Sequence, residues 1–311
     1  MRALCLDRFG GPEVLELREL PDPEPPAGHA RVRVKSVGLN FADVYRRRGD
    51  YHIDGAPPYV LGYEGAGVVD ASADPRVKPG DRVGFADVPR ANADCVIAPV
   101  DKLIPLPAET SFDTAAASLL QGLTAQYLVR DSHPLKPGET MLVHAAAGGV
   151  GLMLCQLGKL LGAHVWGVTS TEAKAAEAHA AGAERVFTND WRSQARDVDV
   201  VYDSVGSTLD DSLKAARRGG HVVFYGMAGG NPAPVDPRRL MDESKTLTGG
   251  DLWNVLTSRE QRLARASELF GWLSSGALTV RIAERVPLAE GARAHQMLEG
   301  RGVVGKVLLI P

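Results

Sequence analysis

Apolar residues follow one pattern in the first part of this chain and a different pattern in the middle. Up to about residue 120, short β-forming runs such as 30–37 and 65–69 are separated by Pro- and Gly-containing segments at 21–26 and 78–81. Short strands separated by such turn formers are typical of β structure without intervening helices. We therefore predict a β-rich domain at the start of the chain.

From about residue 140 to 250, apolar runs of strand length alternate with segments of helical periodicity. This alternation is typical of an α/β domain built on a doubly wound parallel sheet. The predicted helices include 172–181 and 209–217. The predicted strands are 141–146, 164–169, 185–188, 199–204, 220–225 and 246–249.

The last part of the chain returns to mixed structure. Its pattern predicts a helix over 259–274, a strand near 280–286 and a final strand over 305–310. A final strand that follows the α/β segment indicates that it completes the N-terminal β domain. The predicted domains are therefore the β-rich segment 1–122, the α/β segment 123–262 and the returning segment 263–311.

One glycine-rich turn predicts a cofactor class. In residues 142–151 a short apolar strand breaks into alanines and glycines and then resumes as a helix. Ala146 replaces the first glycine of the G-x-G-x-x-G pattern, and Gly148 and Gly151 follow. A glycine cluster alone is as often an ordinary tight turn. The strand before it, the helix after it and the next strand at 164–169 favour a pyrophosphate site at a helix N-terminus.

Composition argues against several other classes of function. The net charge of −3 offers no electrostatic reason to expect nucleic acid or an anionic membrane as partner. The cluster 46–48 of three arginines is interpreted as a solvated helix face. Cys5, Cys95 and Cys155 lack C-x-x-C spacing, which favours a reducing, cytoplasmic compartment. The uncharged run 140–158 is long enough to cross a bilayer, but its central glycines predict a buried strand and helix instead.

The end of the second predicted α/β strand bears on the choice of dinucleotide. NAD-binding units carry an acidic residue there for the ribose 2′-hydroxyl, whereas this chain has Thr169, Ser170 and Thr171, followed by Lys174. Two hydroxyls and an ammonium suit a 2′-phosphate, so we expect NADPH rather than NADH. The alternative is that Ser170 or Thr171 caps the next helix and Lys174 is a surface lysine. Glu172 would repel a phosphate if it pointed toward it.

These motifs resemble the medium-chain dehydrogenase/reductase superfamily and, within it, the zeta-crystallin-like quinone oxidoreductases. The resemblance covers essentially the whole chain. It implies a GroES-like β-rich catalytic domain interrupted by a Rossmann domain. Its most specific segments are 38–45, 61–67, 121–125, 144–151 and 201–206.

The resemblance also implies a reaction without zinc. Zinc-dependent members of the superfamily take ligands from a Cys, a His and a second Cys, and the matching positions here hold Asn40, Tyr63 and Gln121. None of these is a thiolate or an imidazole, so no metal is expected. Without a Lewis acid, an acceptor that spreads negative charge over a conjugated system is favoured over a simple ketone.

Four residues match positions of the catalytic site in the resembled family: Asn40, Asp43, Tyr45 and Tyr51. Asn40 and Asp43 also have the spacing of a helix capping box, and Asp43 with Arg47 that of an i,i+4 ion pair. Tyr51 is the candidate donor of a hydrogen bond to a quinone oxygen, because a phenol stays protonated at neutral pH. It could instead be an aromatic wall that shapes the pocket.

The resemblance further implies a set of cofactor-binding residues. Asn189 stands where the family often has a Tyr near the adenosine phosphate. The set is Tyr127, Ala147, Gly148, Gly149, Val150, Ser170, Lys174, Asn189, Ser204, Phe224, Gly226, Leu247 and Arg301.

The expected activity is the NADPH-dependent, zinc-independent reduction of quinones. The alternative is reduction of α,β-unsaturated carbonyls, namely 2-alkenals, enones or enoyl thioesters, which makes the same demands on a site. A crystallin-like structural or RNA-binding protein is the alternative from a different class. Relatives commonly dimerise through an edge strand of the nucleotide domain, and segment 245–250 is the candidate here for a homodimer.

Overall fold

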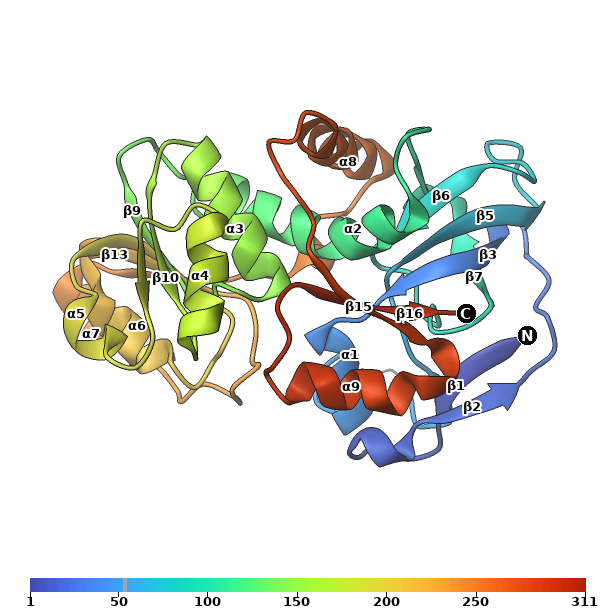
Figure 1. Ribbon diagram of the computed structural model, residues 1–311, viewed down its shortest axis with the longest axis horizontal. Helices are drawn as coiled ribbons and strands as arrows, with labels where there is room; N and C mark the ends of the chain where they lie inside the picture. The colour runs from blue at the N-terminus through green and yellow to red at the C-terminus, as the bar shows by residue number, and fades with distance from the viewer. Residues whose placement is uncertain (53–54) are drawn as a thin grey trace. The chain divides into compact units, whose positions relative to one another are not determined.

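The structure, a computed structural model, describes residues 1–52 and 55–311 and divides the chain into two compact units (Figure 1). Unit 1 consists of residues 1–120, 256–270 and 280–311, and unit 2 of residues 121–255 and 271–279. The chain therefore leaves unit 1, builds most of unit 2 and returns. The start of the returning segment lies at residue 256, within the segment that the pattern groups with the dinucleotide domain.

Unit 1 is a β domain in which distant parts of the chain pair. Its main sheet has the strand order β15-β16-β3-β5-β6-β8, and β7 also pairs with β3. Leu308 of β16 pairs with Gly38 of β3 in antiparallel register, which confirms that the final strand completes the N-terminal domain. A smaller sheet has the order β2-β1-β4. The strands are β1 Arg2–Leu6, β2 Glu16–Glu19, β3 His29–Gly38, β4 Tyr59–Val60, β5 Gly65–Ser72, β6 Arg82–Phe85, β7 Cys95–Pro99, β8 Ile104–Pro105, β15 Ile282–Pro287 and β16 Lys306–Ile310.

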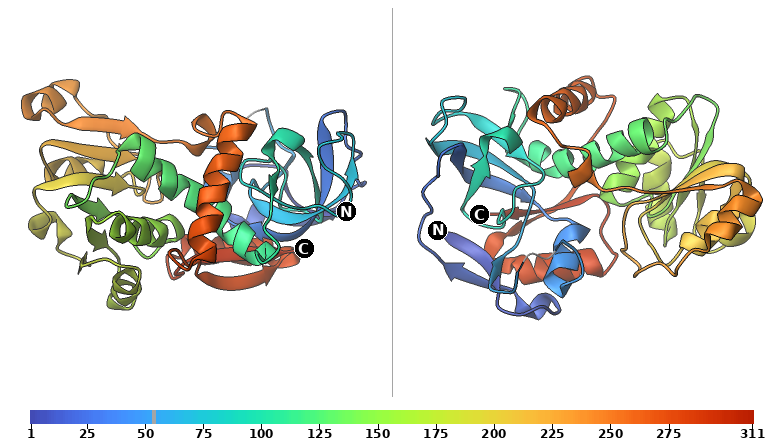
Figure 2. Two further views of the ribbon diagram at one scale, coloured as in Figure 1. Left: turned by 90° about the horizontal axis from the view of Figure 1, so that it is seen from above. Right: turned by 180° about the vertical axis from the view of Figure 1, so that it is seen from behind.

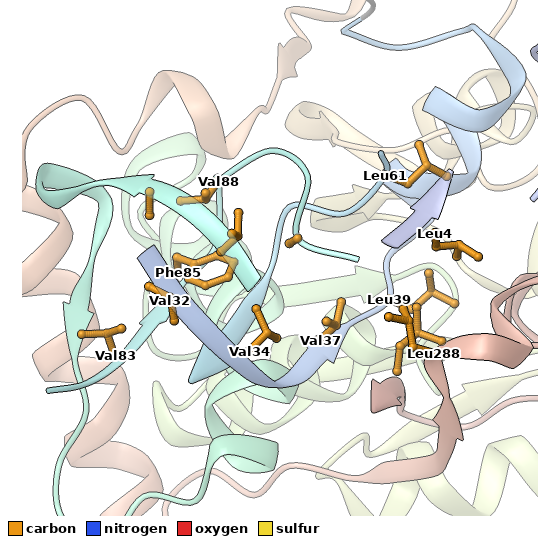
Figure 3. Close-up of a cluster of buried hydrophobic side chains, with 14 of the residues drawn as sticks. Leu4, Val32, Val34, Val37, Leu39, Leu61, Val83, Phe85, Val88 and Leu288 are labelled. Carbon is orange, nitrogen blue, oxygen red and sulfur yellow. The ribbon is translucent and has the colours of Figure 1, made fainter. Parts of the chain in front are cut away.

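The core of unit 1 follows from the alternation of residues along its strands. Ala30, Val32 and Val34 of β3 are buried, because alternate side chains of a strand point to the same face. Figure 3 shows Val32 and Val34 in one cluster with Phe85 of β6. The helices of this unit include α1 Phe41–Arg48, most of α8 Arg259–Ser274, α9 Gly291–Glu299, and three short 3₁₀ helices, Pro12–Val14, Val100–Lys102 and Leu288–Glu290. Helix α2, Phe112–Tyr127, begins in unit 1 and ends in unit 2.

Unit 2 contains a parallel sheet of six strands in the order β11-β10-β9-β12-β13-β14. This order confirms the predicted doubly wound sheet. The strands are β9 Thr140–Val143, β10 His164–Val168, β11 Arg185–Phe187, β12 Val198–Asp203, β13 Ala216–Phe224 and β14 Thr246–Gly249. The first strand ends three residues earlier than predicted, because the chain turns at His144. Strand β13 begins earlier than predicted and shortens the preceding helix.

Helices cover both faces of this sheet (Figures 1 and 2). On one face, Gly158 of α3 lies directly over Met141 and Val165. On the other face, Leu142 and Val201 pack in the cluster that contains Trp191 and Leu209. The helices are α3 Gly149–Leu160, α4 Glu172–Ala180, α5 Trp191–Gln194, α6 Leu209–Ala215, α7 Pro237–Glu243, a π-helical turn Leu128–Ser132 and a 3₁₀ helix Leu252–Asn254.

The uncharged run at 140–158 folds as β9, a turn and most of α3, as the sequence predicts. Its strand and much of its helix are buried against neighbouring elements. Across the described residues, 1–52 and 55–311, no helix has both the length and the hydropathy that a membrane span requires.

Candidate functional site

The glycine-rich turn of unit 2 leads into a helix that no side chain caps. Ala146 keeps a negative φ, whereas Ala145 adopts the left-handed φ of 49°. The N–H of Gly148 donates to the carbonyl of Ala145 over 2.8 Å and closes the turn. A Cβ on Gly151 would lie 2.2 Å from that same carbonyl oxygen, so the close approach of helix to turn requires glycine there.

The first turn of α3 has the features of an anion site. Gly148 is the N-cap residue and provides no side-chain hydrogen bond, and no acidic residue lies in the first turn. The first N–H groups of a helix lack partners within the helix and carry the positive end of its dipole. The residues present therefore fit the pyrophosphate of a dinucleotide.

The other predicted cofactor residues of unit 2 gather around the carboxyl ends of its parallel strands. Turns that follow parallel strands lie at the same edge of a sheet, where ligands of such folds bind. Ala147 and Gly148 follow β9, Ser170 follows β10, Asn189 follows β11, Ser204 follows β12, Phe224 and Gly226 end and follow β13, and Leu247 lies in β14. Tyr127 ends α2 and its hydroxyl lies against Gly250, just after β14. Arg301 belongs to unit 1, where it follows α9 with a φ of 54°.

Asp203 holds the turn that carries Ser204. Its Oδ1 accepts hydrogen bonds from the N–H groups of Val205 and Gly206, and its Oδ2 accepts one from Ser212 over 2.6 Å. Ser212 Oγ in turn lies 3.0 Å from Nε2 of His144, at the end of β9. Burial lowers the pKa of His144, so the imidazole is neutral and Nε2–H can donate to Ser212. This buried network joins the turns after β9 and β12.

Near the predicted binding site for the adenosine end of the dinucleotide, the structure shows which hydroxyl caps the next helix, a question that the sequence left open between Ser170 and Thr171. Thr171 is the N-cap of α4, and its hydroxyl accepts from the N–H of Lys174 over 3.3 Å. The preceding Ser170 is exposed. Thr171, and not Ser170, therefore fills the capping role. Glu172 is exposed in the first turn of the same helix.

In unit 1, Asn40 lies in a buried ion-pair cluster. Lys306 Nζ donates to Asn40 Oδ1 over 2.7 Å and to Glu64 Oε2 over 2.6 Å. Asn40 Nδ2 donates to Glu64 Oε2 over 2.9 Å and to the carbonyl of Gly38 over 3.0 Å. Both ends of the Asn40 amide are thus engaged inside the protein. Lys306 and Glu64 are 1% and 0% exposed, so the ionic groups depend on each other for solvation.

Backbone geometry completes this cluster. The N–H of Leu120 donates to Glu64 Oε1 over 2.7 Å, so both oxygens of the carboxylate have partners. A Cβ on Gly38 would lie 2.4 Å from Glu64 Oε2, so glycine leaves the space that the carboxylate occupies. The pairing of β16 with β3 brings Lys306 to Asn40 from the far end of the sequence.

Asp43 completes the capping box at the start of α1, and among the described residues only one of its two oxygens has a hydrogen-bond partner. Its Oδ2 accepts a hydrogen bond from the N–H of Asn40 over 2.8 Å, as a capping box requires. Its Oδ1 is buried and has no hydrogen-bond partner among residues 1–52 and 55–311. Burial raises the pKa of Asp43 to about 6, and the nearby Arg46 opposes that rise.

The expectation that 46–48 is a solvated face is wrong for two of its three arginines. Arg46 is 4% exposed, and its guanidinium stacks 3.2 Å from the ring centre of Tyr63 and 5.3 Å from that of Tyr51. Tyr51 also meets Tyr45 edge to face at 6.0 Å. Of the three arginines, only Arg48 is exposed. Helix α1 therefore buries Arg46 against aromatic rings instead of presenting it to water.

Arg47 does not form the expected pair with Asp43. It is fully buried and donates to both oxygens of Glu299 over 2.8 and 2.9 Å. It also donates to Nδ1 of His295 over 3.1 Å, and burial lowers the pKa of that histidine to about 3. These contacts tie α1 to α9, and the i,i+4 spacing gave no sign of them.

Three residues of the unit 1 cluster were not predicted as site residues: Glu64, Lys306 and Arg46. Glu64 lies within a motif that carries the family resemblance. Lys306 has a local signal, because a lone ammonium begins an otherwise apolar final strand. Arg46 has none, since a basic residue in the last turn of a helix is ordinarily solvated.

The chain matches models of two domain families. The model for the alcohol dehydrogenase GroES-like domain matches residues 26–140, and that for zinc-binding dehydrogenases matches residues 149–269. Quinone oxidoreductase from Pseudomonas aeruginosa is 41% identical in an alignment that covers 97% of this chain and 97% of its own. The chain belongs to the quinone oxidoreductase family. This membership confirms the resemblance and the GroES-like and Rossmann assignments.

Solved and curated relatives extend this comparison. Escherichia coli quinone oxidoreductase in complex with NADPH superposes with a TM-score of 0.95, at 38% identity and over the whole of both chains. A mycobacterial protein in complex with NADPH has the same TM-score and identity and also covers both chains fully. A 2-haloacrylate reductase from a Burkholderia species is 35% identical over 99% of this chain and 98% of its own.

The family match concerns zinc-binding dehydrogenases, so the residues at the zinc positions matter. Asn40 is engaged with Lys306 and Glu64, and Tyr63 stacks on Arg46. Among the residues that the structure describes, no group of three or more His, Cys, Asp or Glu side chains is placed to hold a metal ion.

Replacement of Lys306 tests the buried ion pair. Lys306→Met leaves the Glu64 carboxylate buried without its cation, so we expect the free energy of unfolding to fall by about 3–5 kcal/mol. Guanidinium unfolding followed by circular dichroism measures this. The double variant Glu64→Gln/Lys306→Met removes both charges and should recover part of the loss. A single-variant loss below about 1 kcal/mol would contradict the argument.

Asp43 predicts a pH dependence of stability. Its pKa is about 6 in the folded protein and 3.8 as an unperturbed group, so between these pH values the folded state binds more protons than the unfolded state. Stability relative to Asp43→Asn should therefore fall as pH rises from about 4 to 7, by up to about 3 kcal/mol. Denaturant unfolding of both proteins across this range gives the difference. A flat difference would contradict the raised pKa.

Proposed function

We propose that this chain reduces quinones with NADPH as the hydride donor. The observation that carries the proposal is the uncapped N-terminus of α3 after a glycine turn, in a chain 38–41% identical to quinone oxidoreductases. Two structural relatives were solved with NADPH bound. When bound, NADPH supplies a hydride. The residues proposed to hold it are those of the strand ends described above, with the N–H groups of Gly149 and Val150 at the pyrophosphate.

For the acceptor, we propose a site made by the aromatic residues beside α1. Reduction of a quinone places negative charge on a conjugated system, which hydrogen bonds and nearby cations can stabilise without a metal. Tyr51 and Tyr45 are partly exposed and in contact with each other, and the Arg46 cation lies against Tyr51. We therefore assign Tyr51 as a hydrogen-bond donor to the acceptor oxygen, with Tyr45 shaping the site.

Asn40 is assigned a positioning role instead. Its amide nitrogen and oxygen are both engaged by Glu64, Gly38 and Lys306, and the side chain is buried. It holds the start of α1, from which Asp43, Tyr45 and Arg46 project. Asp43 supports the same helix turn and places a buried carboxyl beside the cation.

The alternative acceptor class rests on one relative. The similar Burkholderia protein is a 2-haloacrylate reductase, and haloacrylates are α,β-unsaturated carboxylates. Alkenals, enones and enoyl thioesters share this conjugation, so the same donors would serve them.

An acceptor panel tests the activity. We expect the purified protein to oxidise NADPH fastest with 1,4-benzoquinone, compared with a 2-alkenal, crotonyl-CoA and a simple ketone. Absorbance at the reduced nicotinamide band gives each kcat/KM. Fastest turnover with the alkenal or thioester would assign the enone class instead. No turnover with any of the four would favour a crystallin-like structural or RNA-binding role.

Lys174 carries the choice of dinucleotide. We propose that it and Ser170 bind the 2′-phosphate of NADPH, since Ser170 is exposed and is not the helix cap. Lys174→Ala should weaken NADPH binding by about 1.5–3 kcal/mol and leave NADH binding unchanged. Fluorescence titration with each dinucleotide measures this. Equal losses for both would contradict the assignment.

We also propose a cytoplasmic homodimer without zinc. Three buried, unpaired cysteines fit a reducing compartment. Strand β14 is at the edge of the unit 2 sheet, where a second copy could extend the sheet. Sedimentation velocity of the purified chain tests the dimer, and elemental analysis of the active protein tests the absence of zinc.

A further inference from the structure

The side-chain amide of Gln121 lies flat against the first residue of α3. A Cβ built on Gly149 would be 2.1 Å from both Nε2 and Oε1 of Gln121, and 2.2 Å from its Cδ. Equal approach to both polar atoms means that the face of the amide covers the Gly149 backbone. Both residues belong to unit 2. Gly149 is therefore required to be glycine for the amide to occupy this place.

The Gln121 amide has polar capacity that the protein does not use. Among residues 1–52 and 55–311, no hydrogen bond is made by its Nε2 or Oε1. Gln156, on the neighbouring α3, instead donates to Leu152 and Thr279 and accepts from Thr279. Gln121 is only partly exposed, and its amide, with two N–H donors and a carbonyl, packs against Gly149.

The position of the Gln121 amide indicates which group of a ligand it would contact. Gly149 begins the uncapped helix whose N–H groups fit a pyrophosphate. A neutral amide adds N–H donors beside that anion without adding a charge, whereas a carboxylate of the same shape would repel it. The resemblance places a metal-binding cysteine at this position in zinc-dependent enzymes, and here the residue faces the dinucleotide turn.

We propose that Gln121 is a cofactor-binding residue that donates a hydrogen bond from its side-chain amide to the pyrophosphate of NADPH. The proposal rests on the proposed function, since it requires that the chain bind a dinucleotide. It differs from the role of Lys174 in one respect. A pyrophosphate contact serves NADPH and NADH equally, whereas a 2′-phosphate contact serves NADPH alone.

The test compares Gln121→Glu and Gln121→Leu with the wild type. Gln121→Glu preserves shape and reverses the interaction, and Gln121→Leu removes the donors. Exposed Gln261 on α8 gives the matched control Gln261→Glu, which adds the same charge elsewhere. The dissociation constants of NADPH and NADH are measured by fluorescence titration, and that of adenosine 2′-monophosphate, which lacks the pyrophosphate, by competition.

We expect Gln121→Glu to weaken both dinucleotides by the same factor, about ten- to a hundredfold, with a smaller loss for Gln121→Leu. The loss should shrink as salt is raised, because screening reduces the repulsion. Adenosine 2′-monophosphate should bind all variants equally, and Gln261→Glu should match the wild type. Unchanged thermal unfolding midpoints would show that the variants remain folded.

Other outcomes overturn the proposal. Unchanged dinucleotide binding with a raised KM for 1,4-benzoquinone would assign Gln121 to the acceptor. Unchanged binding with a lowered unfolding midpoint would assign it to packing against Gly149. A loss confined to NADPH would assign it to the 2′-phosphate. If the wild-type protein binds neither dinucleotide, both the proposed function and this proposal are wrong. If the wild type binds both dinucleotides and the variants bind them equally well, only the proposal for Gln121 is wrong.

Discussion

The buried ion pair between Lys306 and Glu64 is the interaction on which the unit 1 site depends. Two fully buried charges are stable only if each polar atom finds a partner, because water is excluded. Asn40, the N–H of Leu120 and the space left by Gly38 meet this requirement. The pair thereby fixes the start of α1. Tyr45 and Arg46 lie on that helix and both contact Tyr51, so an ion pair between distant parts of the chain supports the geometry of the proposed acceptor site.

In unit 2, a buried carboxylate is stabilised by backbone N–H groups and neutral side chains instead of by a cation. The parallel sheet brings six turns to one edge, and Asp203 holds the turn after β12 by accepting from two backbone N–H groups and two hydroxyls. His144 joins the same network from the end of β9. The anion site at α3 is then left without a side-chain cap. The hydrogen bonds that stabilise these turns therefore come from side chains beneath them, and the first N–H groups of α3 have no side-chain cap.

Hydrogen bonding inside the protein also distinguishes two residues that the family resemblance treats alike. Asn40 and Gln121 both stand at positions where zinc-dependent enzymes carry ligands. The Asn40 amide is engaged at both ends by Lys306, Glu64 and Gly38. The Gln121 amide has no such partner among the described residues and lies on the dinucleotide turn. The Asn40 amide therefore holds the start of α1, whereas the role that we propose for the Gln121 amide is to hold a ligand.

The sequence by itself determined the order of elements, the parallel sheet, the glycine turn and the return of the final strand, because periodicity and turn residues are local properties. It also determined the family, through motifs spread over the whole chain. Only the tertiary structure decided which polar side chains are engaged. Lys306 meets Asn40 across 266 positions, and Arg47 meets Glu299 across 252. No local pattern encodes such pairs, because the partner and the burial of each charge arise only when distant strands and helices pack together.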